Sequence, residues 1–135
     1  MMIFANADKC IRYLSYAYQG TCHDFTILKM ELQPEKGGWL DHQTVHVDLG
    51  YQGIEKIYRM GQLQIPEKKK KKTALSEEQK KCNREKSSFR VKVENSIAGM
   101  KRFRFMSDRI RTKNICFYNK VAGISAGLWN FNLTN

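Results

Sequence analysis

A change of pattern halfway along the chain most limits how it can fold. Up to Pro66 the sequence has short apolar runs separated by Gly, Pro, Asn and Asp, which is typical of short strands joined by turns. These runs predict strands at about residues 2–7, 11–18, 44–49 and 63–66. From Ser76 onward the apolar residues recur at helical spacing. Strands followed by long helices within 135 residues predict one domain of the α/β or α+β class, over residues 1–135.

The helical parts carry their own start signals. A helix is expected from Asp24, with Phe25, Leu28 and Leu32 on one face, and a short helix at 55–60. Ser76 followed by Gln79 resembles a capping box and predicts the start of a helix that runs to about Ile110. The last helix is expected over about 114–128 or beyond. Its predicted apolar side consists of Phe117, Val121, Ile124 and Leu128.

Charge is divided unevenly along the chain. Residues 1–66 carry 6 Lys and Arg against 7 Asp and Glu, whereas residues 67–135 carry 18 against 6. A basic second half indicates a polyanionic partner, with nucleic acid ranked above an anionic membrane surface because no strongly amphipathic helix stands out. The Lys-rich run at about 67–75 predicts a solvated loop, either a plain linker or a phosphate contact.

Two further features concern location. The longest weakly polar stretch, 121–133, is too short to span a bilayer. The four cysteines show no CxxC spacing, which favours free thiols in a reducing cytosol.

Two carboxylates, Asp48 and Glu94, are candidate catalytic residues. Asp48 follows the predicted buried strand at 44–49, and functional side chains gather at the carboxyl ends of strands in open α/β folds. Glu94 lies beside the apolar stripe formed by Phe89, Val93, Ile97 and Met100, with Arg90 one turn before it. Taken alone, this is ordinary helix ion pairing. If Asp48 and Glu94 converge, they are suited to bind Mg²⁺ for phosphodiester chemistry, with the basic helix surface holding the nucleic-acid backbone.

Four stretches occur in an order that resembles a known family. They are "GTCHDFTILK", "VDLGYQGIEK", "LSEEQKKCNRE" and "SSFRVKVENSIAGMKRFRFMSDRIR". They resemble the C-terminal part of bacterial insertion-sequence transposases of the DDE type, also called DDE superfamily endonucleases. The most specific piece is Arg90, three residues, Glu94, six residues, Lys101. The resemblance implies an α/β, RNase H-like mixed sheet flanked by helices. It also implies DNA cleavage and strand transfer with Asp, Asp, Glu and two Mg²⁺ or Mn²⁺ ions.

The resemblance assigns roles to individual positions. Asp48 matches the second catalytic Asp and Glu94 the catalytic Glu, and both are the implied metal ligands. Arg90 and Lys101 match basic positions that contact DNA, and Arg102 and Arg104 extend this basic stretch. His23 and Asp24 match an "HD" pair without an assigned role.

The chain departs from the family pattern in two places. The family's first catalytic Asp lies on a strand upstream of the hairpin, and Asp8 falls in the hairpin turn, a poor place for a metal ligand. Ser87 stands where the signature has a tyrosine. The chain is therefore expected to be an N-terminally truncated catalytic domain, with little strand-transfer activity of its own. Its expected partners are transposon-end and target DNA, and either a second copy or a complementing N-terminal fragment, in the bacterial cytoplasm near the nucleoid.

Two alternatives remain open. A non-catalytic basic DNA-binding module would bind DNA in a salt-dependent way without metal-dependent cleavage. A zinc site could use Cys22, His23, His42 and His46, although their spacing matches no known zinc pattern.

Overall fold

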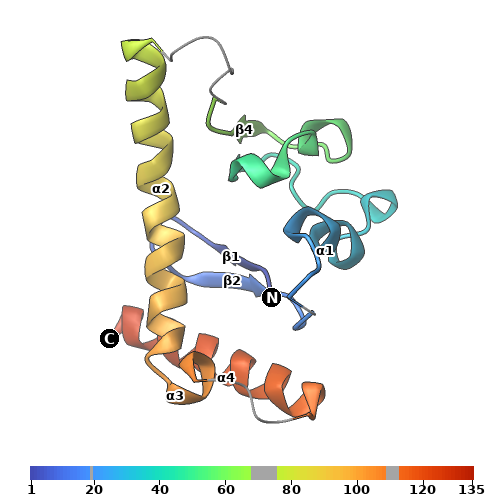
Figure 1. Cartoon of the computed structure of the whole chain (residues 1–135), viewed down its shortest axis with the longest axis vertical. Coiled ribbons are helices and arrows are strands. Elements are labelled where there is room, and N and C mark those ends of the chain that lie inside the picture. Colours follow the sequence, from blue (N-terminus) through green and yellow to red (C-terminus); the bar gives the residue numbers. More distant parts are fainter. Residues whose placement is uncertain (19, 68–75, 109–112) are drawn as a thin grey trace. The chain divides into compact units, whose positions relative to one another are not determined.

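The computed structural model describes residues 1–18, 20–67, 76–108 and 113–135 (Figure 1). They form two compact units, one made of Met1–Cys22 with Val91–Asn135 and the other of His23–Arg90. The predicted mixture of helices and strands is confirmed, but the described strands form two separate two-stranded sheets rather than one mixed sheet. The single-domain organisation and the RNase H-like arrangement stay predictions. Most of the expected Lys-rich loop, residues 68–75, lies outside the described residues.

The first unit is built on a hairpin. Strands β1 (Ile3–Ala5) and β2 (Ile11–Leu14) pair antiparallel, as the sequence predicts. Asn6 shapes the turn, because its Oδ1 accepts hydrogen bonds from the backbone N–H groups of Asp8 (3.1 Å) and Cys10 (2.9 Å). Asp8 is exposed in this turn.

Three helical segments complete the first unit. They are the C-terminal half of α2 (Glu77–Lys101), the short α3 (Arg104–Ser107) and α4 (Ile115–Thr134). The prediction of one helix to about Ile110 is wrong, because α2 ends at Lys101 and α3 begins three residues later. Ile110 itself lies outside the described residues.

The face on which α4 packs differs from the prediction. Its buried residues are Tyr118, Ala122, Ser125 and Ala126, whereas Phe117, Ile124 and Leu128 are largely exposed. Ala122 and Ala126 join Ile11 and Met100 in the core of this unit. Small side chains let the α4 backbone approach its neighbours closely, so the predicted apolar side is the wrong one.

The second unit carries most of the short elements. They are α1 (Asp24–Glu31), β3 (Thr44–His46), β4 (Gln62–Gln64), the first part of α2, and the 3₁₀ turns η1 (Pro34–Lys36), η2 (Leu49–Tyr51) and η3 (Ile54–Lys56). Where the sequence predicts a helix at 55–60, only the turn η3 forms. The predicted capping box is confirmed: the Gln79 N–H donates to Ser76 Oγ (3.2 Å), and the Ser76 N–H donates to Gln79 Oε1 (3.0 Å).

The core of the second unit gathers around α1. Leu28 and Leu32 are buried as predicted, together with Ile54 and Tyr58. The Tyr58 hydroxyl donates to the Leu32 carbonyl oxygen over 2.6 Å and so satisfies a group at the end of α1.

The strand before Asp48 is shorter and less buried than predicted. β3 covers Thr44–His46 and pairs in parallel with β4, and the side chains of Thr44 and His46 are exposed. A two-stranded sheet has no further strands or layers to bury both of its faces, so the expectation of a buried strand is wrong.

Two further observations concern the cysteines and the helices that the structure describes. Cys10, Cys22, Cys82 and Cys116 are free, as predicted. Among the helices that the structure describes, none has the length and apolar character needed to cross a membrane.

Candidate active site around Asp48

Asp48 lies at the junction between β3 and η2. It has an extended backbone (φ −79°, ψ 167°), and its carbonyl accepts a hydrogen bond from the Tyr51 N–H (3.1 Å). Its carboxylate is 58% exposed, and its Oδ2 is 4.0 Å from Arg90 Nη1 on α2, whose side chain is 61% exposed. An exposed pair at this distance contributes little stability, so Arg90 can exchange this partner for another anion without a large cost.

Tyr51 connects Asp48 to the start of α1. Its ring meets that of Phe25 at a centroid distance of 6.0 Å in an edge-on arrangement. Burial, followed by the charges of Asp24 and Asp48, raises the pKa of Tyr51 from 10.0 to about 12. Both carboxylates are therefore close enough to act on the Tyr51 hydroxyl, which stays protonated at neutral pH.

The "HD" pair occupies the start of α1. His23 is its N-cap, and His23 Nδ1 accepts a hydrogen bond from the Phe25 N–H (3.3 Å). Asp24 is the first helical residue, where a negative charge is favoured by the helix dipole. A Cβ built on Gly50 would lie 3.9 Å from His23 Cε1. The pair thus lies beside the turn that follows Asp48, a position that the sequence did not reveal.

The pKa of Tyr51 gives a test of this geometry. Because the folded state holds the phenolic proton more tightly than the unfolded chain, this stabilisation is complete below pH 10 and is lost as the pH rises towards 12. Between pH 10 and pH 12, we expect the free energy of unfolding of Tyr51→Phe to fall less steeply with pH than that of the unsubstituted chain. Urea denaturation at several pH values measures both curves, and parallel curves would contradict the burial of Tyr51 near Asp24 and Asp48.

The other predicted residues lie in or at the edge of the first unit. Glu94 is exposed on α2, one helical turn after Arg90. Arg102 lies over the indole of Trp129, with 5.8 Å between the guanidinium carbon and the ring centroid. Arg104 Nε is 3.8 Å from Asp108 Oδ2, and Lys101 ends α2. Asp48 and Glu94 fall in different units, so their expected proximity stays a prediction.

Comparison with known proteins identifies the family. The family model of the DDE superfamily endonucleases matches residues 1–130. The chain belongs to the DDE superfamily endonuclease family. It is also 32% identical over 115 residues to a protein of Microchaete diplosiphon named probable transposase for insertion sequence element IS702. This match covers 85% of the chain but only 39% of the relative. The chain therefore spans well under half the length of this curated relative. No solved structure matches the chain.

A metal site in this DDE chain is incomplete in the described residues. Enzymes of the family generally use divalent metals, and carboxylate oxygens such as those of Asp48 suit Mg²⁺ in kind. The described residues nevertheless contain no group of three or more His, Cys, Asp or Glu side chains placed to hold a metal ion, neither around Asp48 nor among the residues of the zinc alternative. These residues by themselves do not fit the number of ligands that such a centre needs.

Tyr51 belongs to the candidate site but is not among the residues predicted from the sequence. A signal was available, because Tyr51 follows Asp48 by three residues within "VDLGYQGIEK". Gly53, in the same stretch, has a positive φ of 88°, which favours glycine between the turns η2 and η3.

Proposed function

We propose that this chain is part of the catalytic domain of an insertion-sequence transposase, which cleaves DNA at transposon ends and joins them to a target. Family membership and the name of the relative support this function. The observation that carries it is the placement of Asp48 at the exit of β3, beside the start of α1 and paired with Arg90 of α2. A carboxylate that leaves a strand next to a basic helix suits an enzyme acting on a phosphodiester.

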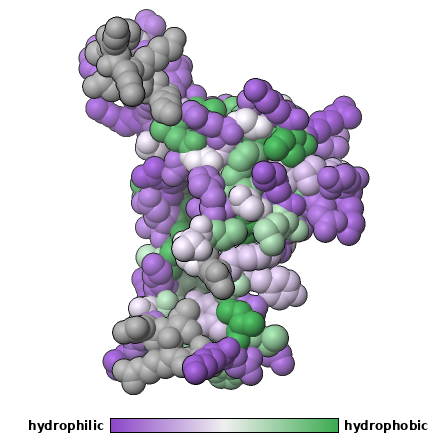
Figure 2. Space-filling model, turned by 45° about the vertical axis from the view of Figure 1, so that its right-hand side comes forward, coloured by the Kyte–Doolittle hydropathy of each residue, from purple (hydrophilic) through white to green (hydrophobic). Residues whose placement is uncertain are grey.

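The proposed roles follow the family pattern. Asp48 and Glu94 are the catalytic carboxylates and metal ligands, in an RNase H-like arrangement that uses Mg²⁺ or Mn²⁺. Arg90 releases its weak ion pair with Asp48 and binds a DNA phosphate, because an Arg–phosphate pair is stronger than an exposed contact at 4.0 Å. Lys101, Arg102 and Arg104 bind neighbouring phosphates. On the face shown in Figure 2, hydrophilic residues predominate and hydrophobic residues form separate patches.

Catalysis requires a further carboxylate from another polypeptide segment. Two carboxylates are fewer than phosphoryl transfer with two metal ions needs. We propose that this further carboxylate lies on an additional strand, which pairs with the edge of β1 that faces away from β2. The outer edge of β2 is less open, because both backbone groups of Ile11 are hydrogen-bonded to the side chain of Asn130.

The test of this function separates binding from cleavage. The chain alone is expected to bind duplex DNA with strong salt dependence and to leave transposon-end DNA uncut in Mg²⁺ or Mn²⁺. Adding the region that precedes the matched part in a longer relative should restore cleavage, and Asp48→Ala or Glu94→Ala should abolish it. Cleavage by the chain alone that Asp48→Ala removes would contradict the need for a complementing segment.

Binding has its own matched variants. Arg90→Ala or Lys101→Ala should each reduce the slope of log affinity against log salt by about 1, because each removes a phosphate contact. Lys36→Ala, in the nearly neutral first half, is the control and should leave the slope unchanged. Equal slopes for all three variants would contradict the proposed DNA surface. Salt-dependent binding without cleavage, even after complementation, would favour the alternative of a non-catalytic DNA-binding module.

A further inference from the structure

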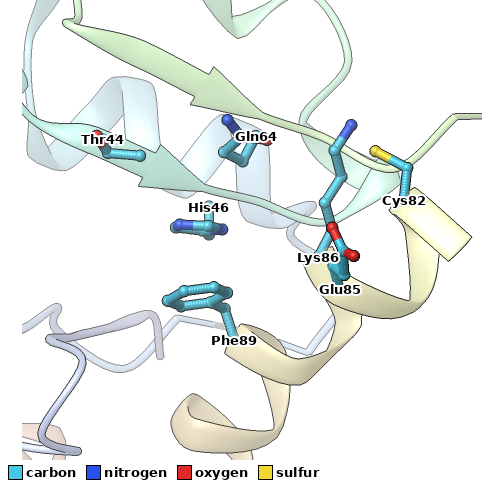
Figure 3. A pocket seen from close by; sticks show the side chains of 7 residues that line it. All are labelled: Thr44, His46, Gln64, Cys82, Glu85, Lys86 and Phe89. Atoms are coloured by element: carbon cyan, nitrogen blue, oxygen red, sulfur yellow. The ribbon is translucent and has the colours of Figure 1, made fainter.

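A groove in the second unit lies between the β3–β4 sheet and the first part of α2. Figure 3 shows it from close by, with His46 from β3 over Phe89 from α2, and Gln64, Glu85 and Lys86 around them. Its volume is about 280 Å³, and it is open to solvent. Volume and openness suit one planar group that enters from outside rather than a fully enclosed ligand.

The floor of the groove is a stacked pair of rings. The centroids of His46 and Phe89 are 4.1 Å apart, and the ring planes differ by 16°. His46 is exposed, and Phe89 is 39% exposed. A partly exposed ring stack is a platform on which a further aromatic ring can lie, and nucleobases stack on such side chains whatever their sequence.

The rim of the groove offers polar groups that match a base. Gln64 supplies both a donor and an acceptor, and the Glu85 carboxylate supplies acceptors. Lys86 Nζ donates a hydrogen bond to the Ile65 carbonyl oxygen (2.9 Å), which holds its positive charge at the rim.

The groove continues directly to the candidate active site. His46 precedes Asp48 by two residues, and Phe89 immediately precedes Arg90. The same two segments are therefore bridged twice, by the His46–Phe89 stack and by the Asp48–Arg90 ion pair. A base held in the groove would place the sugar–phosphate linkage beside it close to Asp48 and Arg90.

We propose that this groove binds one unpaired nucleobase of DNA, stacked on His46 and Phe89, next to the phosphate on which Asp48 acts. The proposal rests on the proposed function, since it assumes that the chain binds DNA. It adds a site that reads an extruded base, whereas the phosphate contacts of Arg90 and Lys101 carry no information about pairing.

The experiment compares two DNA duplexes that differ by one bulged 2-aminopurine. The full chain should bind the bulged duplex about tenfold more tightly than the fully paired one, and the fluorescence of the bulged base should change on binding. His46→Ala and Phe89→Leu should remove the preference, whereas His46→Phe, which retains a ring, should keep it. Phe105→Leu is the matched control, because Phe105 is also 39% exposed but lies on α3.

The outcomes separate this proposal from the proposed function. Binding of paired DNA without a preference for the bulge, or a preference that survives His46→Ala, would overturn the base site and leave DNA binding intact. Loss of the preference in Phe105→Leu as well would also overturn it, because the effect would not belong to the groove. Absence of salt-dependent binding to either duplex would instead show that the proposed function fails. Circular dichroism of each variant confirms that it is folded.

Discussion

Gly99→Ala is expected to destabilise the first unit by about 3 kcal/mol. In an exposed helix interior this change normally stabilises by about 1 kcal/mol, because glycine has a poor helix propensity. Here a Cβ on Gly99 would overlap atoms Cε3 and Cδ2 of the Trp129 indole. The indole cannot retreat easily, since its Nε1–H donates to the Lys9 carbonyl oxygen over 3.0 Å. The substitution must therefore separate α4 from α2 or break this hydrogen bond.

The chain offers two matched controls on α4. A Cβ on Gly123 or Gly127 would meet nothing within 4 Å. Gly123→Ala and Gly127→Ala should therefore stabilise by up to about 1 kcal/mol each, from helix propensity alone. Urea denaturation followed by circular dichroism measures all three variants. A Gly99→Ala variant as stable as the two controls would contradict the close contact between α2 and Trp129.

The features that sequence analysis predicted well are local ones. The capping box of Ser76 and Gln79 needs only residues three positions apart, and both of its hydrogen bonds form. The hairpin turn likewise depends on Asn6 and its immediate neighbours. Local features of this kind form independently of the rest of the chain, because their hydrogen-bond partners lie only a few residues apart.

The packing of α4 could not be predicted in the same way. The large apolar residues Phe117, Val121, Ile124 and Leu128 have the spacing of a core face. The helix instead packs through Ala122 and Ala126. Which face of α4 is buried depends on partners that are distant in the sequence, such as Lys9 and Ile11. The hydropathy of the α4 residues alone does not encode these partners.

Only part of the candidate site could be predicted, because the rest depends on contacts between residues that are distant in the sequence. The position of Asp48 at the end of a strand is a local pattern that can be predicted from the sequence. The approach of Asp24 and Asp48 to Tyr51 depends on how α1 packs against η2, so only the folded second unit reveals it. The proximity of Asp48 and Glu94 involves both units and remains a prediction.

Asn130→Ala is expected to destabilise the first unit by about 2–4 kcal/mol, because it leaves two backbone groups unpaired. The Asn130 Oδ1 accepts a hydrogen bond from the Ile11 N–H, and its Nδ2 donates to the Ile11 carbonyl oxygen, both at 2.8 Å. At Ile11, the Asn130 side chain thus makes the hydrogen bonds that a neighbouring strand would make along the outer edge of β2. Its removal should also make this edge available to other chains, so we expect faster aggregation by light scattering.

Two other asparagines of α4 serve as comparisons, because their removal is expected to destabilise the chain less than Asn130→Ala. Asn119 accepts one hydrogen bond, from the Ala17 N–H over 3.0 Å, so Asn119→Ala should cost about 1 kcal/mol. Asn132 is exposed, and Asn132→Ala should change the free energy of unfolding by less than about 0.5 kcal/mol. The expected order of stability is therefore Asn132→Ala, then Asn119→Ala, then Asn130→Ala. If Asn130→Ala were as stable as Asn132→Ala, the edge of β2 would not be held by this side chain, and an added strand could then pair with either side of the hairpin.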